Sequence, residues 1–215
     1  MRRCDPYFSS LEQGDFILDI GAGRQIFENE YAKYREKNKS EPLNCRIITF
    51  DLADIKNDQL FTNHPHIQAD GTNLPFADGS IAGAVSNMAL DFIPKEAIGE
   101  LNRVLKQGAS VFLNLHHEHL IPLYLDYDLN RLLKKIQDKN KFKGRIPEKW
   151  LQDFAVLNHR KYLRDNNILY KSEKQIREIF GQNDFKVLRA TEATDGKDKW
   201  WEVDLVKLSK SQKAA

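Results

Sequence analysis

Cysteine is scarce in this chain of 215 residues, because only Cys4 and Cys45 are present, far apart and outside any Cys-x-x-Cys pair. This usage is typical of a reducing compartment and argues against a structural zinc site. Long apolar runs are also missing. No stretch approaches the length of a bilayer-spanning helix, and the basic start from Met1 to Pro6 lacks the apolar core of a signal peptide. We therefore expect a cytoplasmic protein.

An excess of one charge is absent too, since the formal net charge is only +2. The distribution is nevertheless uneven. Residues 131–165 carry eleven Lys or Arg against four Asp or Glu, a net charge of +7, whereas the rest of the chain carries 22 against 27, a net charge of −5. The length predicts a single α/β domain over residues 1–215 with one insertion. The basic segment fits either a solvated helix face or an anionic or nucleic-acid partner.

The segment Phe16–Gly23 organises the rest of the chain. Its apolar run ends in an acid and then breaks into two glycines, which is typical of a buried strand that turns sharply. Gly21 and Gly23 allow positive φ and let a ligand lie against bare backbone. Residues 24–35 then carry apolar side chains at helical spacing. The pattern predicts a glycine turn between a strand and a helix N-terminus, where a nucleotide or nucleoside can dock.

A second apolar run closed by an acid follows at Arg46–Asp51, and we interpret it as the next parallel strand. An acid at this position, beside the glycine turn, can accept both hydrogen bonds from a ribose diol. Asp51 would equally well cap the following helix. The residues by themselves leave both roles open.

Strand and helix patterns then alternate, which is the signature of a doubly wound α/β sheet. The expected strands are 66–70, 81–87 and 109–115, and the expected helices are 56–61 and 94–105, with Gly108 just past the end of the second helix. A capping box begins at Ser172 and predicts another helix. The runs 185–194 and 200–208 predict a terminal hairpin through an Asp-Gly turn.

Between these parts, residues 118–170 interrupt the alternation with two amphipathic helical patterns. The insertion leaves the sheet at the edge where ligands bind, so we expect it to form a lid over an acceptor. Tyr124, Tyr127 and Trp150 could line an apolar acceptor pocket there. Ordinary packing between the two helices would explain the same aromatic side chains.

Three segments occur in a fixed order on these elements, namely Phe16-Ile-Leu-Asp-Ile-Gly-Ala-Gly23, Asp70-Gly-Thr-Asn-Leu-Pro-Phe-Ala-Asp-Gly-Ser-Ile81 and Glu100-Leu-Asn-Arg-Val-Leu-Lys-Gln-Gly108. They resemble motifs of the class I S-adenosylmethionine (SAM)-dependent methyltransferases. The resemblance runs from about Phe16 to Leu208. It implies a Rossmann-like sheet of seven strands, mostly parallel with an antiparallel C-terminal hairpin strand, and a helical insertion after strand five.

The resemblance also implies a set of residues that bind SAM and its product, S-adenosyl-L-homocysteine. Asp19 would help to hold the amino group, Asp51 would bind the ribose hydroxyls, and Asp70 would meet the adenine edge. The implied cofactor-binding residues are Asp19, Gly21, Ala22, Gly23, Gln25, Asp51, Leu52, Asp70, Gly71, Asn87 and Met88.

Two positions depart from the family's pattern. Gln25 stands where a third glycine is frequent, so either the helix lies farther from the turn or the Gln25 side chain reaches the cofactor. Asp91 follows Leu90 where small-molecule members often have His, which changes the proton chemistry on the acceptor side.

Methyl transfer from a sulfonium needs alignment more than acid or base catalysis. Where the acceptor is a hydroxyl or a protonated amine, a base must take its proton, and the candidate catalytic residues at this sheet edge are Asp91, His116 and His117. The run from His116 to His119 does not predict a metal site, because consecutive strand residues face opposite sides and no distant ligand motif completes the set.

We therefore expect SAM-dependent methyl transfer to a small-molecule acceptor. The alternatives are a nucleic-acid methyltransferase that uses the basic insertion and a non-catalytic SAM-binding member of the family, the latter because of Gln25. A nicotinamide-dependent oxidoreductase is disfavoured, because Ile26 occupies the place of the last glycine in the dinucleotide fingerprint.

Overall fold

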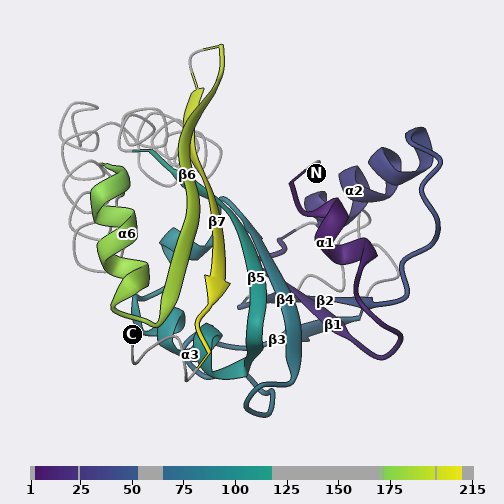
Figure 1. Cartoon of the computed structure of the whole chain (residues 1–215), viewed down its shortest axis with the longest axis horizontal. Helices are drawn as coiled ribbons and strands as arrows, with labels where there is room; N and C mark the ends of the chain where they lie inside the picture. The colour runs from purple at the N-terminus through teal and green to yellow at the C-terminus, as the bar shows by residue number, and fades with distance from the viewer. Residues whose placement is uncertain are drawn as a thin grey trace, which may run out of the picture.

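A single seven-stranded sheet forms the centre of the molecule (Figure 1). The structure is a computed structural model that describes residues 3–23, 25–52, 65–117, 170, 172–196 and 198–209. The strand order is β3-β2-β1-β4-β5-β7-β6. Strands β1 to β5 are parallel, and β7 is antiparallel to both of its neighbours. The predicted Rossmann-like sheet, mostly parallel with an antiparallel terminal hairpin, is confirmed.

The elements follow the predicted alternation along the chain. The strands are β1 (Phe16–Ile20), β2 (Arg46–Asp51), β3 (His66–Gln68), β4 (Ile81–Asn87), β5 (Leu105–His116), β6 (Phe185–Asp195) and β7 (Asp198–Lys207). The helices of the described residues are α1 (Asp5–Ser9), α2 (Ile26–Lys37), α3 (Glu96–Val104) and α6 (Glu173–Gly181), with a 3₁₀ turn η1 (Leu90–Phe92).

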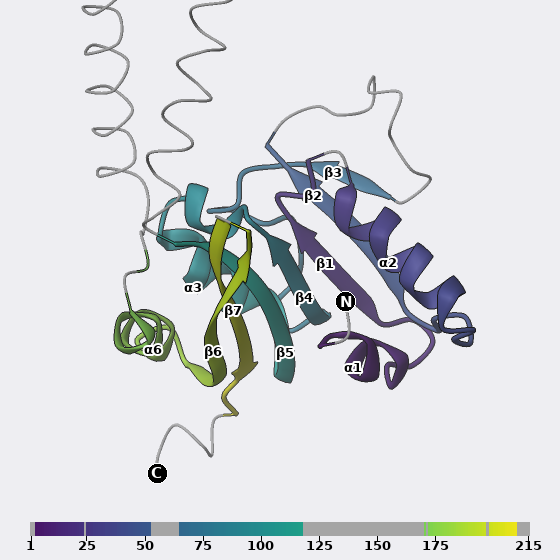
Figure 2. The ribbon, with the colours of Figure 1, turned by 90° about the horizontal axis from the view of Figure 1, so that it is seen from above.

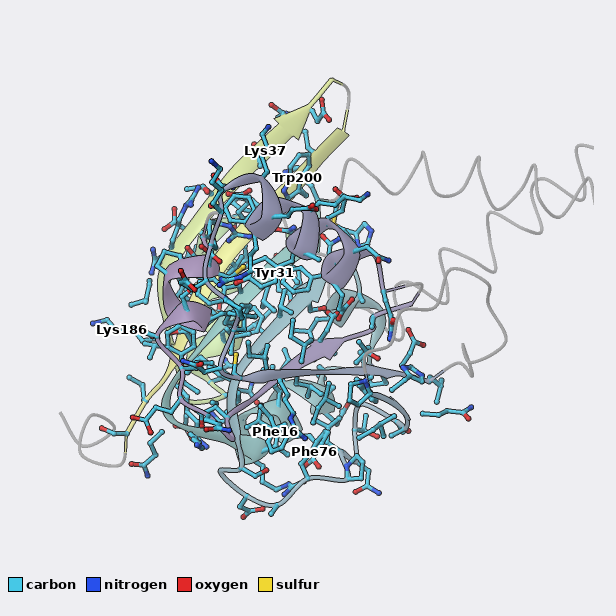
Figure 3. The ribbon with its side chains drawn as sticks, turned by 90° about the vertical axis from the view of Figure 1, so that its right-hand side faces the viewer. Phe16, Tyr31, Lys37, Phe76, Lys186 and Trp200 are labelled. Atoms are coloured by element: carbon cyan, nitrogen blue, oxygen red, sulfur yellow. The ribbon has the colours of Figure 1, made fainter. Side chains whose placement is uncertain are left out.

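Helices cover both faces of the sheet, α1 and α2 on one face and α3 and α6 on the other (Figure 2). On the first face, Phe8 of α1 packs against both Tyr31 of α2 and Phe112 of β5. Tyr31 points from α2 toward the sheet (Figure 3). Helix α1 has only five residues, too few to be stable alone, so the complete burial of Phe8 is what holds it in place.

The opposite face carries the larger apolar core. Leu101 of α3 and Phe180 of α6 are completely buried there against Leu113 of β5 and Val203 of β7. Residues that alternate along β5 point to opposite faces, so Phe112 belongs to one core and Leu113 to the other. This is the doubly covered sheet that the continuous apolar runs in the sequence predict.

The order in which the strands are added to the sheet reverses at β1. Strand β1 pairs with β2 on one side and with β4 on the other, both in parallel (Figure 2). The loops after β1 and β4 therefore leave the same edge in opposite directions and open a crevice between them, the usual ligand position in such sheets.

The start of β5 differs from the expectation. The helix predicted over residues 94–105 ends at Val104, within one residue of the expected end, but the strand predicted to begin at residue 109 begins directly at Leu105. Leu105 pairs with Ile81 and Ser110 pairs with Gly83, so β5 holds three more residues than β4 between these two pairs. Gly108, with φ of 75°, lies in this bulge, where a positive φ is needed, and does not stop the helix.

Smaller differences occur at other element ends. Strand β3 stops at Gln68, two residues before the predicted end, and the terminal hairpin is longer than predicted. Ser172 caps α6 as expected, because its Oγ accepts a hydrogen bond from the Gln175 amide at 3.3 Å. The predicted helix 56–61 and nearly all of the predicted lid 118–170 lie outside the described residues. No helix in the described part of the chain has the length and apolarity needed to cross a membrane.

Candidate functional site

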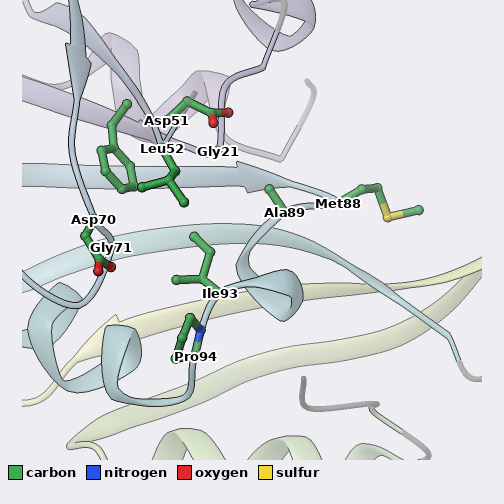
Figure 4. A pocket seen from close by; sticks show the side chains of 10 residues that line it. Gly21, Asp51, Leu52, Asp70, Gly71, Met88, Ala89, Ile93 and Pro94 are labelled. Atoms are coloured by element: carbon green, nitrogen blue, oxygen red, sulfur yellow. The ribbon is translucent and has the colours of Figure 1, made fainter. Parts of the chain in front are cut away.

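A pocket of about 380 Å³ opens at the carboxyl edge of the sheet, where β1 separates β2 from β4 (Figure 4). Its size is within the range of small-molecule sites. Loops after four neighbouring strands contribute its walls. The lining residues are Gly21, Phe50, Asp51, Leu52, Asp70, Gly71, Met88, Ala89, Ile93 and Pro94.

The glycine turn after β1 is attached to the end of β2. The amides of Gly21 and Ala22 both donate to the Phe50 carbonyl, at 2.8 and 3.0 Å. Gly21 has φ of 67°, and a Cβ at this position would lie 2.3 Å from the Cβ of Ala89. Glycine is therefore required twice, for the backbone conformation and for the close approach of the loop after β4.

Asp51 connects the same turn to the pocket wall. Its Oδ2 accepts a hydrogen bond from the Gly23 amide at 2.9 Å, so the carboxylate and the turn hold each other in position. Leu52 follows with 71% of its surface exposed, although it is a large apolar residue in the pocket lining. A carboxylate beside an exposed apolar surface suits a ligand with hydroxyl donors and a flat apolar group.

Asp70 and Gly71 form the wall on the β3 side, away from Met88 (Figure 4). Asp70 Oδ1 accepts hydrogen bonds from the Thr72 amide and hydroxyl, both at 2.9 Å. These donors hold the pKa of Asp70 below its usual value, so it is a carboxylate at neutral pH. A Cβ at Gly71 would lie 2.8 Å from Ile93 Cγ2, which brings the β3 and β4 loops together.

Met88 lines the pocket at the end of β4 in an unusual conformation. Its φ is 59°, which is costly for a residue with a side chain, and its amide donates to the Asn114 carbonyl at 2.8 Å. Asn87 is exposed and is absent from the pocket lining; its side-chain oxygen accepts from the Asn114 amide group at 2.9 Å. Of these two predicted cofactor contacts, only Met88 borders the pocket.

Gln25 is completely buried and does not line the pocket. Its side-chain amide donates to Thr49 Oγ1 of β2 at 2.9 Å, so the Gln25 side chain fixes the start of α2 to the sheet. It has φ of 55° and makes no side-chain capping bond to α2. Gly23 and Ala22, also predicted as cofactor contacts, belong to the turn but are not among the lining residues.

Asp19 lies beneath the glycine turn with 1% of its surface exposed. Burial, followed by the charge and hydrogen bonding of Glu28 and the charge of Asp51, raises the pKa of Asp19 well above its usual range. Glu28, in the first turn of α2, is 2% exposed, and neither of its carboxyl oxygens has a hydrogen-bond partner when both acids are ionised. Glu28 belongs to no sequence motif, so nothing in the pattern of the chain marks this helix residue as one that is turned inward.

A second buried pair lies next to the pocket. Asp91 in η1 and His116 at the end of β5 are 4% and 3% exposed, and Asp91 Oδ2 is 2.7 Å from His116 Nδ1. The same oxygen accepts from the His116 amide at 2.6 Å. Asp91 lies between Ala89 and Ile93, which both line the pocket. Two of the three predicted catalytic residues are therefore brought together.

His117 points elsewhere. Its ring stacks on Trp201 with centroids 5.7 Å apart, and its Nε2 is 3.6 Å from Glu192 Oε1. Tyr170, which belongs to no sequence motif, has a fully buried hydroxyl with no hydrogen-bond partner. Burial, with a smaller contribution from the charge of Asp91, raises the pKa of Tyr170 above its usual value.

The remaining predictions concern metals and the acceptor pocket. Among the described residues, no group of His, Cys, Asp and Glu side chains could hold a metal ion. Tyr124, Tyr127 and Trp150 lie outside the described residues, so the predicted acceptor contacts stay predictions.

Comparisons with known proteins agree with this geometry. Residues 18–113 match the family model of the methyltransferase domain. Among curated proteins no significant match was found. The similar solved structures include the methyltransferase in a complex with the Trm112 methyltransferase activator of Haloferax volcanii, which is 14% identical with a TM-score of 0.58; the match covers 97% of this chain and 89% of that one.

Two further structures show the same fold. A SAM-dependent methyltransferase of Methanosarcina mazei is 19% identical with a TM-score of 0.54, over 92% of this chain and 94% of that one. Phosphoethanolamine N-methyltransferase 2 of Haemonchus contortus, solved with S-adenosylhomocysteine, is 14% identical with a TM-score of 0.56, over 97% of this chain and 52% of that one. The family model identifies residues 18–113 as a methyltransferase domain, and the strand order and the pocket at the switch point agree with the fold of the SAM-dependent methyltransferases that this chain resembles.

Proposed function

We propose that this methyltransferase acts on a small-molecule acceptor and that Asp91 and His116 form its proton-accepting pair. The observation that carries this proposal is the burial of the pair, with only 4% of Asp91 and 3% of His116 exposed, and the position of Asp91 in the turn between Ala89 and Ile93, which line the pocket. A small acceptor can reach such groups through a pocket, whereas a nucleic acid would have to extrude a base to do so.

The described residues fit SAM. The bare turn at Gly21 leaves a surface that a Cβ would fill, and the Asp51 carboxylate beside it suits a ribose diol. Asp70 and Gly71 would meet the adenine edge, and Met88 would border the reacting end. When bound, SAM supplies a methyl group activated on a sulfonium, so the protein has mainly to align donor and acceptor.

The Asp91–His116 pair would remove the acceptor's proton. Asp91 Oδ2, 2.7 Å from His116 Nδ1, favours the tautomer with the proton on Nδ1 and leaves Nε2 as the basic atom. The carboxylate also stabilises the imidazolium that forms when the acceptor's proton arrives. This arrangement supports an acceptor that carries a hydroxyl or a protonated amine.

Calorimetry tests the cofactor contacts directly. SAM and S-adenosylhomocysteine should bind saturably to the wild type, and Asp51→Ala should weaken both by about 10- to 100-fold, the loss of one charged hydrogen-bonding group. Asp51→Asn is the matched variant, because its amide oxygen can still accept from the Gly23 amide while the charge is lost. Wild-type protein that binds neither ligand, or wild-type affinity in Asp51→Ala, would contradict the assignment.

Incubation with labelled SAM identifies the acceptor class. The proposal predicts label in a small-molecule extract and none in an RNA extract. Label in RNA would instead support a nucleic-acid methyltransferase that uses the +7 segment at residues 131–165. Binding without any transfer would support a non-catalytic family member. We also propose a cytoplasmic location, supported by the scarcity of cysteine, of which the chain has only two residues.

A further inference from the structure

Two acidic side chains are buried together beneath the glycine turn. Asp19 comes from β1 and Glu28 from the first turn of α2, and they are 1% and 2% exposed. Each oxygen of Glu28 is inaccessible to solvent and has no hydrogen-bond partner while both acids are ionised. Two buried carboxylates without a cation are strongly unfavourable, because each loses its hydration and repels the other.

One proton shared between the two acids removes most of this cost. A protonated carboxyl is a hydrogen-bond donor, so the pair can then form the bond that two carboxylates cannot form. Burial first, and then Glu28, raise the pKa of Asp19 well above its usual range, which agrees with a proton held at this position. A cation bound to the pair could replace this proton.

The surroundings of the pair indicate which kind of ligand carries that cation. Helix α2 has twelve residues, and Gln25 at its N-cap position points to Thr49 without capping the first turn. A helix start of this kind favours a negative group, because its first amides lack partners within the helix. An anion-binding helix start beside a cation-binding acid pair matches a zwitterion, such as the amino-acid end of SAM.

We propose that Glu28 is a cofactor-binding residue that, with Asp19, receives the ammonium group of SAM or S-adenosylhomocysteine, and that the proton shared by the two acids leaves to solvent as the ligand binds. The pair passes from a charge of −1 to −2 and the bound ammonium adds +1, so the local charge stays constant at −1. The inference rests on the proposed cofactor site and adds to it a residue and a linked proton.

The neighbouring elements carry other titratable groups, each with a partner or a known effect on the pair. On β2, Asp51 adds negative charge and raises the pKa of Asp19 further. On β3, His66 contacts Thr49 Oγ1 through Nδ1 at 3.0 Å, and Thr49 is the partner of Gln25. On α1, Asp5 is neutralised by Arg35 of α2 at 2.5 Å, two turns beyond Glu28. Within the described residues, these partners leave the ligand's ammonium as the cation for the pair.

Calorimetry of the wild-type protein in buffers of different ionisation enthalpy measures the released proton. At pH 7 we expect about one proton to be released when S-adenosylhomocysteine binds, and none for 5′-methylthioadenosine, which has the nucleoside but no amino-acid end. The affinity for S-adenosylhomocysteine should rise by up to about tenfold per pH unit between pH 6 and 8, and that for 5′-methylthioadenosine should not change. S-adenosylhomocysteine binding without proton release would overturn this inference and leave the cofactor site intact.

The isosteric variant Glu28→Gln separates Glu28 from Asp19. Its amide can donate to Asp19, so we expect almost no proton release, an affinity for S-adenosylhomocysteine lower by about tenfold, and an unchanged affinity for 5′-methylthioadenosine. The matched control is Glu30→Gln on the exposed side of the same helix, where Glu30 pairs with Lys33 at 2.8 Å. This control should behave as the wild type does.

The outcomes are distinct. Equal losses for both ligands in Glu28→Gln, or wild-type proton release, would overturn the role of Glu28. No binding of S-adenosylhomocysteine to the wild type would overturn the cofactor site itself. If Glu28→Gln fails to fold, the two wild-type measurements still decide, because they need no variant.

Discussion

Gly21 and Gly23 provide a direct test of how the glycine turn is built. Both have positive φ, 67° and 50°, so a side chain at either position costs about 1–2 kcal/mol in backbone strain. They differ in the space around them. A Cβ at Gly21 would lie 2.3 Å from Ala89 Cβ, whereas the nearest atom to a Cβ at Gly23 is 4.0 Å away. Only Gly21→Ala should therefore add a steric cost.

The size of that cost follows from the contact distance. Carbon atoms in van der Waals contact are about 3.5–4.0 Å apart, so the 2.3 Å approach requires the two loops to move by more than about 1 Å. Overpacking of this kind costs about 1–3 kcal/mol. We therefore expect Gly23→Ala to destabilise by about 1–2 kcal/mol and Gly21→Ala by about 2–5 kcal/mol.

Urea unfolding followed by circular dichroism measures both variants, with the midpoints compared at constant slope. Ala89→Gly removes the opposing methyl group, so the double variant Gly21→Ala/Ala89→Gly should recover about 1–3 kcal/mol relative to Gly21→Ala. Equal destabilisation of the two single variants, or no recovery in the double variant, would refute the contact between the loops as the reason for glycine at this position.

Three other expectations concern stability. Ser172→Ala removes the oxygen that accepts from the Gln175 amide and should lower the unfolding free energy by about 1 kcal/mol, whereas Ser172→Gly should cost only a few tenths; equal losses would contradict the capping role. Tyr170→Phe removes a buried hydroxyl without a partner, so the unfolding free energy should rise by about 1–3 kcal/mol and the melting temperature should rise with it. A lower melting temperature would show that the hydroxyl is satisfied. Lys106, at 2.5 Å, holds the pKa of Asp15 below its usual value, so this pair stabilises the fold above about pH 4 and the contribution is lost as the pH falls through the lowered pKa of the folded state. Lys106→Met should therefore cost about 0.2–1 kcal/mol at pH 7 and nothing near pH 2, and a difference that persists at pH 2 or in high salt would rule out an ionic origin.

The sheet could be predicted because each strand has a sequence pattern of its own. Phe16–Ile20 and Arg46–Asp51 are apolar runs closed by a polar edge, and the helices between them have a clear period. The helix end predicted at residue 105 is within one residue of the observed end at Val104, but the predicted start of the next strand at residue 109 was wrong for a specific reason. A glycine after a helix pattern indicates a stop, but a positive φ is equally needed in a bulge, and only the pairing of β4 with β5 decides between the two.

The site could be predicted only where a side chain belongs to a motif. Asp51, Asp70 and Gly21, which the resemblance names as cofactor contacts, line the pocket, and their contact with SAM stays a prediction. Gln25 was expected near the cofactor or as the cause of a displaced helix, and instead bonds to Thr49, because the contact depends on which residues of β2 face α2. Glu28 was missed since burial of an acid on a helix leaves no sequence signal.

The three extra residues at the start of β5 have a consequence for how this sheet tolerates change. Beyond the bulge, the pairs from Gly83 and Ser110 to Asn87 and Asn114 run without interruption to the edge that carries the pocket. Insertions or deletions within the bulge would change its exposed length while the alternation of side chains beyond it stays the same. The connection from α3 can thus vary in length at one end of the strand while the chemistry at the other end keeps its alignment.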